Sequence, residues 1–167
     1  LSQRIRISRC RLWSDMSRAL LIRFVELLLP ESVLAARGPA SFSFGRSLIA
    51  ASSSPGNVYL AGVSVVSTAL IAGDLSSVGG SVVVAAPISG DALLLGGSVS
   101  SRAPIAGDMR AVGGGVTIEG LVGGDLVVFG YSVNHVGRTQ GSTFVVAANT
   151  ILSGGAIGPA WLSWQAT

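Results

Sequence analysis

A glycine recurs every 17 residues from position 56 to position 158, without a single insertion or deletion. Four of these glycines are followed by aspartate, and the other three are followed by Asn57, Ser142 and Pro159. A fixed period of this kind is the signature of one structural unit that is copied and stacked. We expect the seven glycines to form a structural corner of the stack: Gly56, Gly73, Gly90, Gly107, Gly124, Gly141 and Gly158.

Each position of the repeat forms a column, numbered from the residue two places before the glycine, so that the first copy starts at Ser54. Column 1 is aliphatic in the four central copies, while column 9 is glycine and column 12 is valine in five copies each. Short β-branched runs interrupted by glycine predict strands, and identical copies predict that each strand stacks on its own equivalent. The predicted fold class is therefore all-β, a single-stranded parallel β-helix (solenoid) of about seven coils, with an N-terminal helical segment.

The same columns predict the inside and the corners of this rod. Equivalent residues in paired strands lie about 4.8 Å apart, so seven coils make a rod roughly 30 Å long. The constant aliphatic columns point inward and fill it. The glycine columns mark corners, where either a positive φ or a close backbone approach excludes a Cβ. Aspartate suits such a corner because its carboxylate accepts hydrogen bonds from nearby backbone N–H groups.

Charge is segregated along the 167-residue chain. Residues 1–50 hold eight arginines against three acids, a net charge of +5, and residues 51–167 hold three arginines against five acids, a net charge of −2. The basic charge therefore belongs to the N-terminal part, and the repeats lack the positive surface of a nucleic-acid-binding protein. The single cysteine, Cys10, excludes an internal disulfide and a cysteine metal cluster.

We expect three parts: a basic and apolar leader over 1–37, a linker and incomplete first coil over 38–53, and a β-helix repeat domain over 54–167 that is truncated in its last coil. Within the second part, Gly45, Ser47 and Leu48 occupy the columns where later copies carry glycine, serine and valine. We expect the chain to be a fragment, or its terminal segments to lie outside the original protein.

The leader contains a short apolar run that ends at Pro30. Three interpretations stay open: a secretory signal or membrane-targeting segment, an amphipathic helix that covers the open end of the repeats, and translated upstream sequence. Arg23 and Glu26 interrupt the run, which weakens the signal interpretation. The residues expected to contact a membrane are Leu20, Leu21, Ile22, Phe24, Val25, Leu27, Leu28 and Leu29.

The repeat resembles that of the bactofilins, the polymer-forming cytoskeletal proteins of bacteria. The resemblance is carried by the pattern Ile/Val-x-Gly-Asp-Leu-x-x-Val-Gly-Gly-x-Val-x-Ile, best seen at 71–84, 105–118 and 122–133. It implies a right-handed, three-sided β-helix, end-to-end polymerisation without nucleotide, and membrane attachment through a short apolar N-terminal segment. The chain departs from the family in its longer, more basic leader and in a last coil that stops at Thr167 without a polar cap.

Two kinds of side chain are candidates for chemistry. The aspartates that follow the glycines should form a ladder with steps of roughly 5 Å, either binding a cation such as Ca²⁺ or bonding their own corners. His135, the single histidine, falls in an inward column, where a structural role is favoured over the role of an acyltransferase base because the strict period leaves no substrate-holding loop. The ladder consists of Asp74, Asp91, Asp108 and Asp125.

Column 6 is the candidate contact surface. If column 5 points inward, column 6 points outward, since side chains alternate along a strand. An exposed apolar stripe with few charges would serve association, whereas a turn at the corner would direct the same side chains partly inward. The apolar members of this column are Tyr59, Leu93, Val127, Phe144 and Trp161.

The sequence therefore predicts a structural, self-associating (polymer-forming) scaffold at a bacterial membrane or envelope, and not an enzyme. We expect its partner to be itself, end to end or laterally, with membrane contact through the leader. We expect no cofactor, metal, nucleotide or nucleic acid, and the side of the membrane stays open. The alternatives are an exported β-solenoid surface or adhesion module and a carbohydrate-binding or carbohydrate-modifying solenoid.

Overall fold

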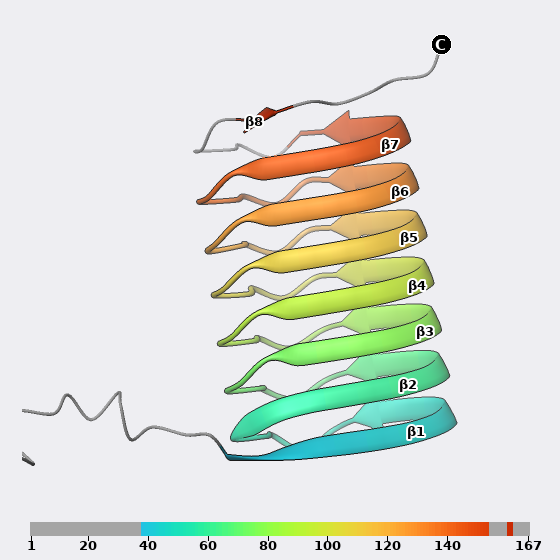
Figure 1. Ribbon diagram of the computed structural model, residues 1–167, viewed down its shortest axis with the longest axis vertical. Coiled ribbons are helices and arrows are strands. Elements are labelled where there is room, and N and C mark those ends of the chain that lie inside the picture. The colour runs from blue at the N-terminus through green and yellow to red at the C-terminus, as the bar shows by residue number, and fades with distance from the viewer. Residues whose placement is uncertain (1–37, 154–159, 162–167) are drawn as a thin grey trace, which may run out of the picture. The chain divides into compact units, whose positions relative to one another are not determined.

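The computed structural model describes residues 38–153 and the backbone of 160–161. They form one parallel sheet in which the strands pair in chain order from β1 to β8, each with the next (Figure 1). The predicted solenoid is confirmed: the described residues form an all-β parallel solenoid with a period of 17 residues. The N-terminal helical segment expected from the sequence lies outside the described residues. The strands are β1 (Gly38–Ala50), β2 (Gly56–Ser67), β3 (Leu75–Val84), β4 (Ala92–Ser101), β5 (Met109–Ile118), β6 (Leu126–His135), β7 (Thr143–Leu152) and β8 (Ala160–Trp161).

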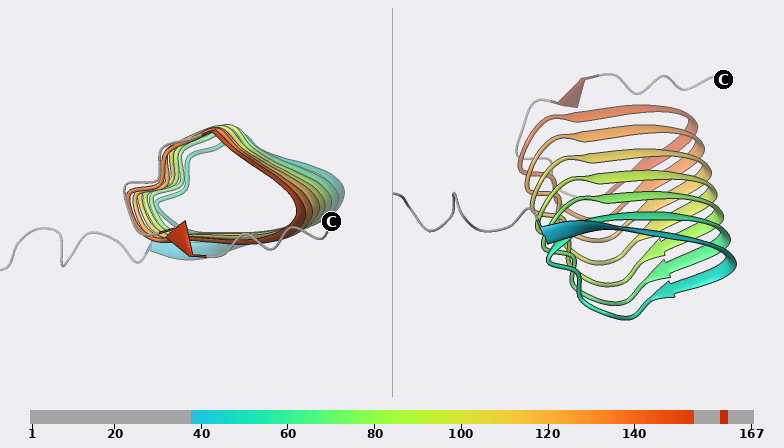
Figure 2. Two further views of the ribbon diagram at one scale, coloured as in Figure 1. Left: turned by 90° about the horizontal axis from the view of Figure 1, so that it is seen from above. Right: turned by 60° about the horizontal axis from the view of Figure 1, so that its bottom comes forward.

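Each coil has three sides, and the coils ascend in a right-handed sense (Figures 1 and 2). A strand forms the first two sides and bends at column 10, where the pairing skips Val63 and Gly80 between paired residues. The third side contains one isolated bridge per coil at column 1, such as Ile88 with Ile105. The bend and the third side therefore close each coil without a long loop.

The core is a set of vertical stacks of aliphatic side chains. Columns 1, 5, 7, 12 and 14 point inward, and the strands show the alternating burial that one solvated face requires. Ile105, Met109 and Ile118 are 1% exposed or less, although they come from different sides of one coil. Each fully buried side chain of this size contributes about 1.5–3 kcal/mol, so the interior supplies most of the driving force for folding.

The glycine corners exist because backbones approach closely, and not because φ is positive. Of the described glycines tested for an added Cβ, none has φ in the left-handed region. At Gly96 in column 9, a Cβ would lie 3.0 Å from the carbonyl oxygen of Gly79 in the coil before. The sequence left both explanations open, and the close approach is the correct one.

The stretch 38–53, expected to be linker and incomplete coil, forms the 13-residue strand β1 over Gly38–Ala50. Its register pairs Gly45 with Gly62 and Leu48 with Val65, as the column alignment predicts. Among the described residues no helix is long and apolar enough to cross a membrane. The expected membrane-contacting residues 20–29, Gly158 and the side chain of Trp161 lie outside the described part of the chain.

Candidate functional site

The aspartate ladder links each coil to the next. The backbone N–H of Asp91 donates to Oδ1 of Asp74 at 3.0 Å, and that of Asp108 donates to Oδ1 of Asp91 at 2.8 Å. The pattern continues through Asp125 and ends at Ser142, whose N–H lies 2.7 Å from Oδ1 of Asp125. The sequence analysis offered hydrogen bonds within the same corner as one alternative. The structure shows instead that each carboxylate accepts a hydrogen bond from the equivalent N–H group one coil later.

This geometry explains why glycine and aspartate occur together. A Cβ at Gly90 would collide with Oδ1 of Asp74, and a Cβ at Gly107 would collide with Oδ1 of Asp91. The carboxylate of one coil thus occupies the space that a side chain in the next coil would need. The first rung has Asn57, whose Oδ1 accepts the N–H of Asp74 at 3.0 Å, so an amide serves the same purpose.

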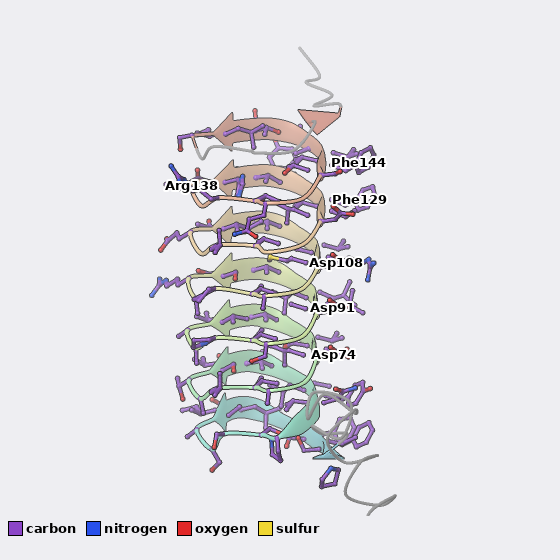
Figure 3. The ribbon with its side chains drawn as sticks, turned by 90° about the vertical axis from the view of Figure 1, so that its left-hand side faces the viewer. Asp74, Asp91, Asp108, Phe129, Arg138 and Phe144 are labelled. Carbon is purple, nitrogen blue, oxygen red and sulfur yellow. The ribbon has the colours of Figure 1, made fainter. Side chains whose placement is uncertain are left out.

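One oxygen of each ladder carboxylate is committed to the next coil, and the ladder lies along an exposed edge (Figure 3). Asp108 also pairs through Oδ2 with Arg110 at 3.5 Å. In the part of the chain that the structure describes, no group of three or more histidine, cysteine, aspartate or glutamate side chains could hold a metal ion. The geometry assigns the ladder a structural role.

His135 lies inside the rod, as its column predicts, with 2% of its surface exposed. It stands between Ile118 of the coil before and Leu152 of the coil after. Its Nε2 is 3.4 Å from the hydroxyl of buried Thr139, which takes the place of an aliphatic residue in column 1. Burial lowers the pKa of His135 below its ordinary value, which favours the neutral ring and a packing role.

Column 6 points outward, so the stripe predicted from the sequence lies on the surface. In β4 and β7 the column-6 residues Leu93 and Phe144 are exposed between buried neighbours. Column 8, two residues later, is apolar in β1 to β7; it is exposed in β1, β3 and β5 to β7 and half-buried at Ala61 and Leu95. Together these columns form one side of the rod, here called the apolar face. Arg110 in column 6 of β5 is a charged, exposed side chain on it. The large exposed apolar members are Phe42, Phe44, Val78, Leu93, Val112, Phe129, Phe144 and Val146.

Aromatic side chains contact each other at both ends of this face. Phe42 stacks on Tyr59 with ring centroids 4.6 Å apart, and Phe129 meets Phe144 edge to face at 5.9 Å. Figure 3 shows Phe129 and Phe144 on the same side of the rod as the aspartate ladder, with Arg138 on the opposite side. The sequence prediction missed column 8 and β1, although the two-residue alternation that exposes column 6 applies equally to them.

Two hollows lie elsewhere on the rod. One, about 270 Å³ in volume, opens at the β1 end, where Ser41 and Ser43 meet the apolar walls of Leu60 and Ile71. The other is a shallow groove of about 350 Å³ on the third side. Among the residues lining this groove, Ser89 and Gln140 supply the polar side chains and none is titratable, so the lining offers no acid–base pair.

The repeat, the register and the filled interior define this chain as a parallel β-helix repeat protein. No protein-family model matches it, and no curated protein or solved structure shows significant similarity to it.

Proposed function

We propose that this protein is a structural, self-associating β-helix scaffold at a bacterial membrane, related to the bactofilins. The observation that carries the proposal is the constant register. Strands β2 to β7 each pair with the next at an offset of 17 residues, and β1 joins β2 at the same offset from Ser41 onward. A rod built this way offers one pattern of backbone groups and inward side chains at every level.

End-to-end assembly would use that uniformity. A parallel strand alternates its N–H and C=O groups between its two edges, so the outer edge of β1 carries the donors and acceptors that pair strands inside the rod. Ser41 and Ser43 stand in the inward columns of β1 and border the hollow at this end. A coil from a second copy would extend the sheet and cover the walls formed by Leu60 and Ile71.

The leader supports the membrane part of the proposal through its composition. Its apolar run at 20–29 and its excess of arginine suit attachment to an anionic lipid surface. The repeats themselves carry few charges, three arginines and five acids in 117 residues, which suits a protein that assembles.

The test is electron microscopy and sedimentation of the full chain with a matched pair of β1 variants. Ser43→Lys places an inward-pointing charge at the rod end, which should abolish or shorten filaments. Ser47→Lys, an exposed position in the outward column 11 of the same strand, should leave them unchanged. A full-length protein that stays monomeric at its highest soluble concentration would refute the polymer.

Membrane attachment is tested separately by flotation with anionic vesicles. Leu21→Arg combined with Leu28→Arg should release the protein from the vesicles if the leader is the anchor. Equal flotation of the wild type and the variant would contradict the assignment. The exported surface module and the carbohydrate-binding solenoid stay as sequence predictions, because nothing observed in the described residues favours either.

A further inference from the structure

We propose that the apolar face is a lateral interface, on which a second copy of this chain packs face to face with its rod running in the same direction. This pairing deepens the self-association proposed above but does not require end-to-end stacking. It follows from the size of the face, its period, its charged edge and the sizes of its side chains.

The face is large enough for a stable interface. Phe42, Phe44, Phe129 and Phe144 are 62%, 77%, 44% and 37% exposed. At about 200 Å² per aromatic side chain, these four residues alone expose about 440 Å². The largest apolar patch on a typical monomer is about 300–600 Å², so this face exceeds that range once its valines and leucines are added.

Its period fits a second copy better than any unrelated surface. Outward side chains recur at the strand spacing of about 4.8 Å over all seven long strands, because the register never shifts between β2 and β7. Figure 2 shows this side of the coils as nearly straight and superimposed. Two copies with the same spacing interdigitate along the whole rod, as paired sheets do in a dry interface.

The charged edge selects the relative direction. The aspartate ladder borders the face at column 4. Glycines border it at column 9 in β1 to β6 and at column 10 in β3 to β5, whereas column 10 holds the exposed Val63 in β2 and Tyr131 in β6. A two-fold axis parallel to the rods places each aspartate edge against the partner's glycine edge. An axis across the rods would instead place the two ladders side by side and add like-charge repulsion. Rods running in the same direction avoid that cost.

Side-chain sizes agree with the same arrangement. With the axis parallel to the rods, column 6 of one copy faces column 8 of its partner within the same coil. Phe129 then faces a partner valine from column 6, Phe144 faces a partner valine from column 8, and Tyr59 faces a partner alanine. Two coils differ: Phe42 faces a partner Phe44, and the exposed Arg110 faces a partner Val112. Alternating large and small residues at facing positions is how packed layers fill space. The aspartate edge also disfavours an anionic membrane as the occupant.

The first experiment measures assembly by sedimentation of the full chain. Val78→Asp adds a charge to the face, at a side chain 50% exposed that faces the uncharged Ser76 of the partner, and a symmetric pair would bury it twice. We expect the lateral dissociation constant to rise at least about 30-fold. The matched control is Val136→Asp, 50% exposed in column 15 and outside the face, which should assemble like the wild type.

Circular dichroism checks that both variants keep the fold, and Val78→Lys separates a general charge effect from repulsion by the ladder. In filaments, loss of the lateral interface narrows them without shortening them, whereas failure of end stacking leaves short paired rods. Unchanged assembly of both Val78 variants would overturn the proposal. The proposal would also be overturned by a wild-type protein that stays monomeric, or by one whose apolar face binds anionic vesicles instead of a second copy.

The second experiment tests direction by disulfide trapping in a Cys10→Ser background, with one protein of each mixture carrying a tag. Ser76→Cys mixed with Val78→Cys should form tagged–untagged dimers, because columns 6 and 8 of β3 face each other in rods of the same direction. Val78→Cys mixed with Val112→Cys reports the opposite direction, in which β3 faces β5. Trapping of the second mixture but not the first would overturn the stated direction, and trapping of neither would overturn the interface.

Discussion

Replacing Gly107 by alanine adds one methyl group at a corner where two coils meet. A Cβ at this position would collide with Oδ1 of Asp91 and lie 2.8 Å from the carbonyl oxygen of Gly90. The first obstacle is a side chain that can rotate away, but the second is backbone held in the coil below by the hydrogen bond from Gly107 N to Gly90 O at 3.1 Å. The coils must therefore separate locally.

The expected loss of stability has two parts. Forcing an extra methyl group into a packed site costs about 1–3 kcal/mol. Displacing the Asp91 carboxylate also breaks its 2.8 Å hydrogen bond with the N–H of Asp108, which contributes about 0.5–1.5 kcal/mol for an ordinary hydrogen bond. Gly107→Ala should thus lower the free energy of unfolding by about 2–4 kcal/mol.

Gly115→Ala is the matched control in the next strand. A Cβ there meets nothing within 4 Å, its φ lies outside the left-handed region, and column 11 carries serine in the four other copies from β2 to β6. This substitution should stabilise the protein by about 0.4–1 kcal/mol, because it restricts the unfolded chain without straining the folded one.

Urea unfolding followed by far-ultraviolet circular dichroism measures both variants in the full chain. Asp91→Ala combined with Gly107→Ala removes the oxygen but leaves the backbone contact, so the double variant should lose less than the sum of the single losses. The reasoning is refuted if Gly107→Ala unfolds at the wild-type urea midpoint, or if Gly115→Ala is destabilised to the same extent.

Three further predictions use the same measurement. An unfolded histidine has a pKa near its ordinary value of 6.5, and burial lowers the pKa of His135, so the unfolded state binds more protons than the folded state as the pH falls. Wild-type stability should therefore decrease from about pH 7 to about pH 5, and His135→Leu should remove this part of the decrease. Leu94 is fully buried between the small side chains of Ser77 and Ala111 in its column, so Leu94→Ala should lower the free energy of unfolding by about 3–5 kcal/mol. The control is Leu93→Ala, at a side chain 40% exposed, and an equal loss there would contradict the assigned core. Asp91→Asn should retain wild-type stability, as the amide of Asn57 already bonds the next coil, whereas Asp91→Ala should lose about 0.5–1.5 kcal/mol; equal losses would show that charge, not hydrogen bonding, maintains this rung.

The candidate site could be predicted only in part. The outward direction of Leu93 and Phe144 follows from the two-residue alternation once column 5 is taken as inward. The contribution of Phe42 and Phe44 was missed, although the alignment of Gly45 and Leu48 with the later copies already places these two residues in columns 6 and 8, as the pairing of β1 with β2 confirms. The partner of each aspartate was also out of reach, since the bond runs between residues 17 apart in sequence.

The period, the parallel stacking, the register and the inward columns could all be derived from the amino-acid sequence. A constant repeat with strand-forming residues leaves one way to bury its aliphatic columns, which is to place every copy directly on the one before. The reason that the corners are glycine, and the hydrogen-bond partners of the carboxylates, became clear only from the packing of one coil on the next. Both depend on how closely two coils approach at column 3. There the Oδ1 atom of Asp91 occupies the space that a side chain at Gly107 would need. The distance between adjacent coils is set by their packing, so it cannot be read from the sequence of a single repeat.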